Sequence, residues 1–232
     1  MLRCLLFINL FVLCQSIYEL NDMAIVQEVI IGNSTSNSSI QIIDNFFKNI
    51  DLVKQVDRVP VEKDVGFYPG VRYRLLEKPD DPYFDGRTCG ICEITTKPED
   101  LSVEQKMPHV DGGGQEALLV YLEDREDAGT SFYRHIKTGK IKVKDFSDAE
   151  ILHLEKAYIK EDDGYITDSN DRWELLYKVE MKKNRALIYR GNIFHSAYIK
   201  NLRKGRESFN CFTPVLPKVQ FTFGIYPMYY ED

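Results

Sequence analysis

The chain has 232 residues, of which 44% are hydrophobic, 12% aromatic and 28% charged, so its composition is that of a globular protein and not of a disordered one. Its 30 Lys and Arg residues against 36 Asp and Glu residues give a formal net charge of −6 at pH 7. Because this balance provides no general attraction to the phosphates of nucleic acids or to anionic lipids, we expect no nucleic acid as a partner.

The first 16 residues have the pattern of a secretory signal peptide. Arg3 precedes an apolar run from Cys4 to Cys14, and the small residue Ser16 follows. The run has about 11 residues, fewer than the roughly 20 that a membrane-spanning helix needs. We therefore expect no stable membrane span and predict cleavage near Ser16. Such a signal peptide would direct the chain to an endomembrane lumen or out of the cell. If translation starts at Met23 instead, the protein is cytoplasmic.

Residues 24–232 show no internal repeat, no long linker and no change in composition, and so predict one domain. Near the beginning of this domain, Asn33-Ser-Thr and Asn37-Ser-Ser match the acceptor pattern for N-linked glycosylation. The same stretch is also typical of a polar turn between two strands.

Short runs rich in β-branched and aromatic residues predict strands along most of the domain. They are Ile25–Ile31, Ile40–Ile43, Cys92–Thr95, Ala117–Leu122, Ser131–His135, Ile141–Lys144, Trp173–Val179, Ala186–Tyr189, Phe194–Ile199 and Val219–Tyr226. Two helices are expected beside them, at Asp44–Val56 and after the capping box Ser147–Glu150. This pattern predicts a mainly β fold with flanking helices, arranged as a sandwich or a barrel.

The cysteines are too few and too irregularly spaced to predict a disulfide framework. Cys89 and Cys92 form a single Cys-x-x-Cys pattern with no second pair to complete a zinc site. We interpret these two cysteines as semi-buried thiols on a strand.

His109 and Asp111 form the strongest candidate metal-ligand pair in the sequence. In a strand, residues i and i+2 point to the same face, so an imidazole and a carboxylate lie side by side there. His195 lies in a later strand-like run, which a folded sheet brings opposite the first pair. Two histidines and one carboxylate on one face of an octahedral ion are the pattern of non-haem Fe(II) sites.

The surroundings of these three residues resemble the Fe(II)- and 2-oxoglutarate-dependent dioxygenases of the prolyl 4-hydroxylase type. The closer resemblance is to the domain family of unknown function 6445. It rests on the blocks FYPGVR (67–72), TTKPEDLSVEQKMPHVD (95–111), GTSFYRHIKTG (129–139) and NRALIYRGNIFHSAY (184–198). This resemblance implies a double-stranded β-helix, that is, a cupin-like jelly roll, with Fe(II) held by His109, Asp111 and His195.

In that superfamily a Lys or Arg of the last strand pairs with the far carboxylate of 2-oxoglutarate, because a guanidinium and a carboxylate form two parallel hydrogen bonds. This chain departs from the pattern, since the matching position is Gln220, which carries no charge. Lys218 lies two residues earlier on the same face of the expected strand, and Arg190 is another cation that could serve. Tyr121 and Tyr133 could donate hydroxyl hydrogen bonds.

The resemblance therefore implies an Fe(II)- and 2-oxoglutarate-dependent oxygenase that hydroxylates an unidentified protein side chain or small molecule. The alternative is a non-catalytic jelly-roll relative that has lost its 2-oxoglutarate anchor and binds a ligand or partner, as Gln220 suggests. A third interpretation is a cupin-like Zn or Mn protein, because this ligand set does not select iron by affinity alone.

Overall fold

The computed structural model describes residues 16–61, 69–95, 100–111, 115–143, 165–200 and 205–213. The strands are β1 (Ile25–Gly32), β2 (Asn37–Asp44), β3 (Arg58–Pro60), β4 (Gly70–Leu75), β5 (Thr88–Ile94), β6 (Glu116–Tyr121), β7 (Arg125–His135), β8 (Trp173–Met181), β9 (Ala186–Arg190), β10 (His195–Ile199) and β11 (Arg206–Phe212). The helices are α1 (Ile50–Lys54), α2 (Val103–Lys106) and the 3-10 turn η1 (Pro82–Phe84).

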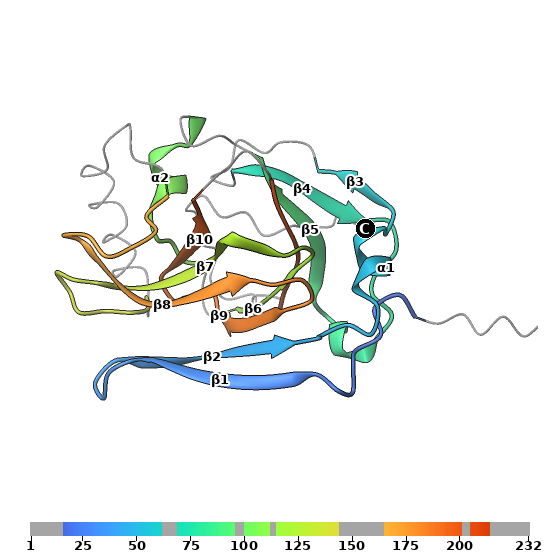
Figure 1. The fold of residues 1–232 in the computed structure, drawn as a ribbon, viewed down its shortest axis with the longest axis horizontal. Coiled ribbons are helices and arrows are strands. Elements are labelled where there is room, and N and C mark those ends of the chain that lie inside the picture. The colour runs from blue at the N-terminus through green and yellow to red at the C-terminus, as the bar shows by residue number, and fades with distance from the viewer. Residues whose placement is uncertain are drawn as a thin grey trace, which may run out of the picture.

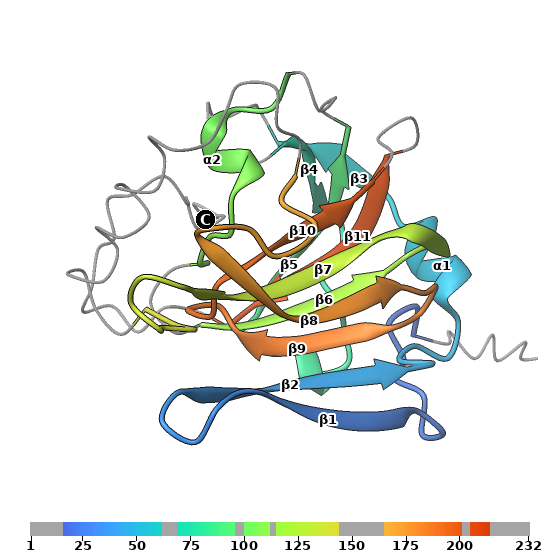
Figure 2. The same cartoon turned by 60° about the vertical axis from the view of Figure 1, so that its left-hand side comes forward.

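Within these ranges the strands form two antiparallel sheets (Figures 1 and 2). The larger sheet has eight strands in the order β1-β2-β9-β6-β11-β5-β4-β3, and the smaller has three in the order β10-β7-β8. Strands distant in the sequence are neighbours in this order, as when β11 lies between β6 and β5. The protein is therefore mainly β, with the sandwich and jelly-roll-like architecture expected from the sequence.

Apolar side chains cover both faces of the larger sheet. One cluster lies between the two sheets and contains Tyr121 of β6 together with Phe132 of β7. A second cluster lies on the outer face, where Val53 of α1 packs with Phe209 of β11. Because successive side chains of a strand point to opposite faces, a central strand covered on both sides has apolar residues at every position, as in the run ALLVY of β6.

Most of the expected strands are present, since β1, β2 and β5 to β10 each overlap a predicted run. Three strands, β3, β4 and β11, were not predicted. The expected strand Ile141–Lys144 is wrong in its described part, residues 141–143, where Lys142 forms an isolated bridge with Ile193. The expected strand Val219–Tyr226, the helix after Ser147 and residues 1–15 of the leader lie outside the described residues.

The helix predicted over Asp44–Val56 is much shorter in the structure. Asp44 ends β2, and Asn45 takes a left-handed backbone with φ 59°. The side chain of Asn184 then accepts a hydrogen bond from the Phe47 backbone N–H (2.9 Å) and donates one to the Phe47 carbonyl (2.8 Å). Because these groups are already paired across the fold, the helix begins only after Asn49, whose side chain caps it.

The interpretation of Cys89 as a thiol is also corrected. Cys89 of β5 and Cys211 of β11 are directly opposite each other in the sheet and form a disulfide. Cys92 is buried and is not part of this bond. The prediction failed because spacing along the chain says nothing about two residues that only strand pairing makes adjacent.

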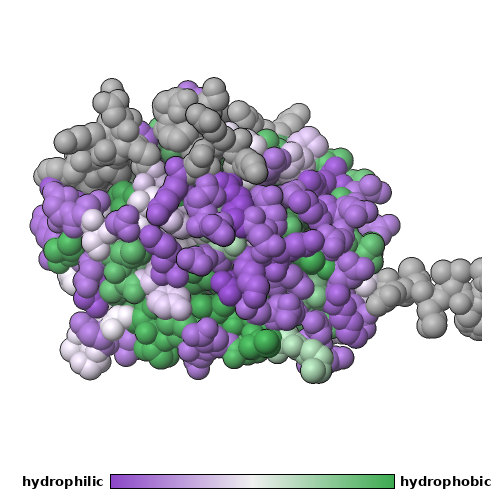
Figure 3. All heavy atoms as spheres, in the orientation of Figure 1, coloured by the Kyte–Doolittle hydropathy of each residue, from purple (hydrophilic) through white to green (hydrophobic). Residues whose placement is uncertain are grey.

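Strand β1 forms one edge of the larger sheet and exposes apolar side chains. Ile25, Val26 and Ile30 are each more than half exposed, and Figure 3 shows hydrophobic surface along the lower margin of the molecule, where β1 lies in Figure 1. No helix among the described residues is long and apolar enough to cross a membrane.

Candidate metal centre

His109, Asp111 and His195 meet at one end of the smaller sheet. His109 follows α2, and its backbone forms a two-bond bridge with the first residue of β10: the His109 N–H donates to the His195 carbonyl (2.8 Å) and the His195 N–H donates to the His109 carbonyl (2.9 Å). One potential ligand atom from each side chain lies within 4.8 Å of the other two. The expectation that folding brings the distal histidine opposite the first pair is thus met in the geometry.

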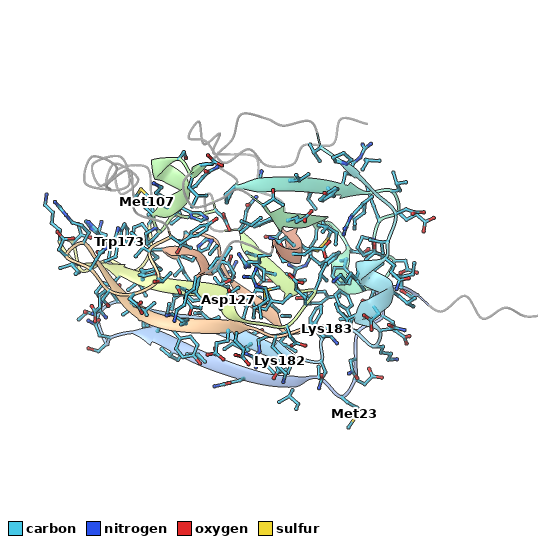
Figure 4. The ribbon with its side chains drawn as sticks, turned by 45° about the horizontal axis from the view of Figure 1, so that its top comes forward. Met23, Met107, Asp127, Trp173, Lys182 and Lys183 are labelled. Atoms are coloured by element: carbon cyan, nitrogen blue, oxygen red, sulfur yellow. A yellow bond between two sulfur atoms is a disulfide. The ribbon has the colours of Figure 1, made fainter. Side chains whose placement is uncertain are left out.

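An apolar cluster holds the segment that carries His109. It lies on the outer face of the smaller sheet and includes Met107, Trp173 and Phe194. Figure 4 labels Met107 and Trp173, which lie close together beneath α2. Since Met107 and Phe194 directly flank the bridged histidine segments in the sequence, this packing fixes where the two imidazoles project.

The three side chains converge on a small volume. Asp111 Oδ2 lies 3.1 Å from His195 Nε2, and Asp111 Oδ1 lies 3.9 Å from His109 Nε2. The two imidazole centroids are 4.7 Å apart. His195 Nδ1 is 2.8 Å from the Ile193 carbonyl, a hydrogen bond that places the proton on Nδ1 and leaves Nε2 facing the carboxylate.

The charges of the three groups are strongly coupled. Desolvation by the surrounding protein, together with the positive charges of His195 and Arg72, lowers the pKa of His109 to about 4. Burial opposes the charged form of His195, but the charge and hydrogen bond of Asp111 outweigh it and raise the His195 pKa. Burial also disfavours ionised Asp111, yet the neighbouring histidines hold its pKa below the usual value. The site therefore concentrates one negative charge between two imidazoles.

Gly191 sets the position of the Asp111 backbone. The Asp111 N–H donates to the Gly191 carbonyl (2.7 Å), and the Gly191 N–H donates to the Gln115 carbonyl (2.7 Å). A Cβ atom on Gly191 would lie 2.8 Å from the Asp111 carbonyl oxygen and 3.1 Å from its Cβ. The chain approaches Asp111 so closely here that only glycine fits without a shift.

This arrangement suits a divalent metal ion. Imidazole nitrogens are borderline ligands and a carboxylate oxygen is a hard one, and together they bind Fe(II), Mn(II) or Zn(II). Three ligands from one side leave coordination positions open for other molecules. The hydrogen bond from His195 to Ile193 is the kind of outer contact that orients metal-binding histidines. The donor set and its support therefore fit a metal ion.

Arg206 is a further candidate residue near the triad, and the sequence interpretation missed it. It begins β11, 11 residues after His195, and is 5% exposed. Its guanidinium donates to Thr130 Oγ1 (3.1 Å) and lies 5.4 Å from the Tyr121 ring centroid, but its Nε is buried and has no hydrogen-bond partner among the described residues. No carboxylate pairs with Arg206 in the described part of the chain. A buried guanidinium without a counter-charge is costly and predicts an anionic ligand.

Arg206 faces the space between the two sheets, as the triad does. Phe209 and Cys211 of the same strand belong to the outer cluster, so residues of the opposite parity, including Arg206, face inward. Asp111 raises the pKa of His195, and burial raises the pKa of Tyr189, whose ring centroid lies 4.9 Å from that of His195; the positive charge of Arg206 opposes both rises. The guanidinium is thus within electrostatic range of the triad.

Three hydroxyl groups surround the Arg206 guanidinium. Tyr121 donates to Thr130 Oγ1 (2.8 Å), which leaves the Thr130 proton available to a further acceptor. The Tyr165 hydroxyl is buried without a hydrogen-bond partner among the described residues, and the charge of Arg206 acts on its pKa. Together these groups could bind a carboxylate.

Two other residues expected to bind the cosubstrate, Tyr133 and Arg190, lie away from Arg206. Tyr133 is on the outer face of the smaller sheet, where its hydroxyl donates to the Ile166 carbonyl. Arg190 is exposed at the end of β9. Lys218 and Gln220 lie outside the described residues. Among the described members of the expected set, Tyr121 alone is therefore placed beside the buried guanidinium.

One sequence signal could have identified Arg206. In the run RESFNCF, polar Arg, Ser and Asn alternate with Glu, Phe and Cys, a period of two that indicates a strand. The run was overlooked because the preceding basic residues resemble a solvated loop and because a strand that turns polar side chains inward lacks the usual apolar face.

Comparison with known proteins supports a family assignment. The model of the family of unknown function DUF6445 matches residues 80–212, more than half of the chain, and this span contains the triad and Arg206. No curated protein matches the sequence. The chain belongs to the family of unknown function DUF6445.

Proposed function

We propose that this protein is an oxygenase that binds Fe(II) through His109, Asp111 and His195 and binds 2-oxoglutarate through Arg206. The observation that carries the proposal is the buried guanidinium of Arg206, which has no carboxylate partner among the described residues and lies on the same inter-sheet face as the triad. A ligand that contacts both features needs a metal-binding end and a distant carboxylate, and 2-oxoglutarate has both.

When bound, Fe(II) supplies the activation of O₂ that couples oxidative decarboxylation of 2-oxoglutarate to hydroxylation of a C–H bond. The chain holds the reactants in place. His195 keeps its Nε2 directed at the metal position through the bond to Ile193, and Arg206 fixes the far carboxylate by charge-assisted hydrogen bonds. The apolar cluster between the sheets, including Phe132 and Ile199, excludes water from the reacting atoms.

The non-catalytic alternative was based on Gln220, the neutral residue at the position expected for the anchor. Arg206 supplies a buried positive charge from a different strand, so Gln220 no longer argues for the loss of the cosubstrate. The Zn or Mn interpretation shares the triad but needs no carboxylate anchor, and a turnover assay separates it from the oxygenase.

Metal binding is tested first, by anaerobic calorimetry with Fe(II) and with Mn(II). We expect His109→Ala, Asp111→Ala and His195→Ala each to abolish measurable binding, because each removes one of three ligands. His153→Ala, which changes a histidine outside the triad, is the matched control and should bind as the wild type does. Undiminished binding in two of the three triad variants would refute the metal site.

Turnover is tested on the Fe(II)-loaded protein by following conversion of 2-oxoglutarate to succinate under O₂. We expect slow conversion even without the natural substrate, and none in His195→Ala. Protein that binds metal but neither binds nor converts 2-oxoglutarate would instead support the ligand-binding alternative or a Zn or Mn site.

A further inference from the structure

The hairpin formed by β1 and β2 carries both glycosylation patterns of the sequence, one beginning in its turn and one at the start of β2. Residues 33–36 form this turn, and the Asn33 N–H donates to the Ser36 carbonyl (2.9 Å). Gly32 has φ +100°, and a Cβ there would lie 2.1 Å from that carbonyl oxygen, so glycine is needed to close the hairpin. In Figures 1 and 2 the hairpin lies at the lower edge of the molecule, whereas α2, which precedes His109, lies at the top.

The Asn33 side chain is oriented by its own turn. Its Oδ1 accepts hydrogen bonds from the Thr35 N–H (3.1 Å), the Thr35 hydroxyl (2.8 Å) and the Ser36 N–H (2.9 Å). Nδ2 makes no hydrogen bond among the described residues, and Asn33 is exposed. Asn33 Nδ2, the nitrogen that would carry a glycan, is therefore free to face solvent. Asn33 Oδ1 accepts a hydrogen bond from the hydroxyl of Thr35, the third residue of the acceptor pattern.

Asn37 is also exposed, but its backbone is paired within the sheet. It is the first residue of β2 and pairs with Gly32, and its carbonyl accepts a hydrogen bond from Lys142 Nζ (3.1 Å). A glycan on Asn37 would begin beside the body of the protein, whereas one on Asn33 would begin at the tip of the hairpin.

The disulfide is an independent observation about the compartment. Cys89 and Cys211 are bonded between two central strands of the larger sheet. Disulfides form and persist in secretory and extracellular compartments and are rare in the cytosol. N-linked glycosylation takes place in the same oxidising pathway. The disulfide and the glycosylation pattern therefore both indicate passage through the secretory pathway.

We propose that this protein matures in the secretory lumen and carries an N-linked glycan on Asn33. The bond that forms joins Asn33 Nδ2 to the anomeric carbon of a lipid-pyrophosphate-linked oligosaccharide. The bond between that carbon and the pyrophosphate oxygen breaks, the lipid pyrophosphate leaves, and the amide nitrogen loses one proton without any change in oxidation state. The glycan extends from the hairpin tip into solvent.

The test is expression of the full 232-residue chain in a eukaryotic cell, followed by mass spectrometry before and after treatment with a peptide N-glycosidase. We expect the enzyme to remove the whole glycan mass and to leave Asp at position 33. Thr35→Ala removes the acceptor pattern and should abolish the glycan. Ser34→Ala changes the middle residue, keeps the pattern and should leave the glycan in place.

Several outcomes would overturn the proposal. Among them are a Thr35→Ala variant with an unchanged glycan, a glycan confined to Asn37, and a secreted wild-type chain with no glycan. A chain that stays in the cytosol with Cys89 and Cys211 reduced would overturn it as well. The proposal does not depend on the metal site, since His195→Ala should still be glycosylated.

Discussion

Arg206→Met should make the ligand-free protein more stable and at the same time impair the binding of 2-oxoglutarate. Methionine keeps the length and apolar stem of arginine but removes the charge. The side chain is 5% exposed, and its one hydrogen bond to a described residue goes to Thr130 Oγ1. Tyr121 still donates to that oxygen after the substitution, so no new unpaired acceptor is created.

The magnitudes follow from the loss of one buried charge. Replacing buried ionic groups by apolar ones of similar volume often stabilises a protein, here by about 1 to 2 kcal/mol, which corresponds to a rise in Tm of about 2 to 8 °C for a chain of this size. A hydrogen bond to a charged group contributes about 1.5 to 3 kcal/mol, so the Kd for 2-oxoglutarate should rise about 10- to 150-fold.

Thermal unfolding of the apo-protein and calorimetric titration of 2-oxoglutarate into the Mn(II)-loaded protein measure the two effects. Arg206→Lys keeps the positive charge but loses the planar guanidinium that forms two parallel hydrogen bonds. Its affinity for 2-oxoglutarate should lie between those of the wild type and Arg206→Met. Lys218→Ala and Arg190→Gln remove the cations that sequence reasoning favoured and should leave the affinity unchanged. If Arg206→Met lowers the Tm and leaves the Kd as in the wild type, the arginine is a structural residue and the proposed anchor is refuted.

Three further predictions follow from single contacts. Gly191→Ala should weaken Mn(II) binding about 10-fold in calorimetry, because the added Cβ displaces the backbone of Asp111; equal affinity would show that the segment adapts. Cys89→Ala should lower the free energy of unfolding, measured in urea, by about 2 to 5 kcal/mol, because the disulfide closes a long loop with a sequence separation of 122. The wild type under reducing conditions should lose a similar amount of stability. Hydrogen-bonded ion pairs with Arg185 and Lys182 lower the pKa of Asp44 in the folded protein. The stability that Asp44 contributes is therefore present above its unfolded pKa of 3.8 and is lost as the pH falls through the folded pKa. In acid titrations below about pH 4, the free energy of unfolding of Asp44→Asn should fall less steeply with pH than that of the wild type.

The sequence alone determined the β-rich class of the fold and pointed to the triad of His109, Asp111 and His195. Strand periodicity is a local property, because the pleat alternates side chains at every second residue whatever the rest of the chain does. The pair His109 and Asp111 depends on the same local rule. Its partner His195 could be expected from the resemblance of the surrounding blocks, and the strand pairing indeed brings these three side chains together.

The tertiary structure decided the residues that only non-local pairing makes neighbours. Cys89 and Cys211 meet because β5 and β11 are paired, and spacing along the chain cannot reveal this. Asn184, far along the sequence, pairs with the Phe47 backbone and limits the helix there. Arg206 is buried only because β11 lies between β5 and β6 and faces the smaller sheet. Burial of a charge depends on what folds over it, and for that reason the proposed anchor could be inferred only from the folded protein.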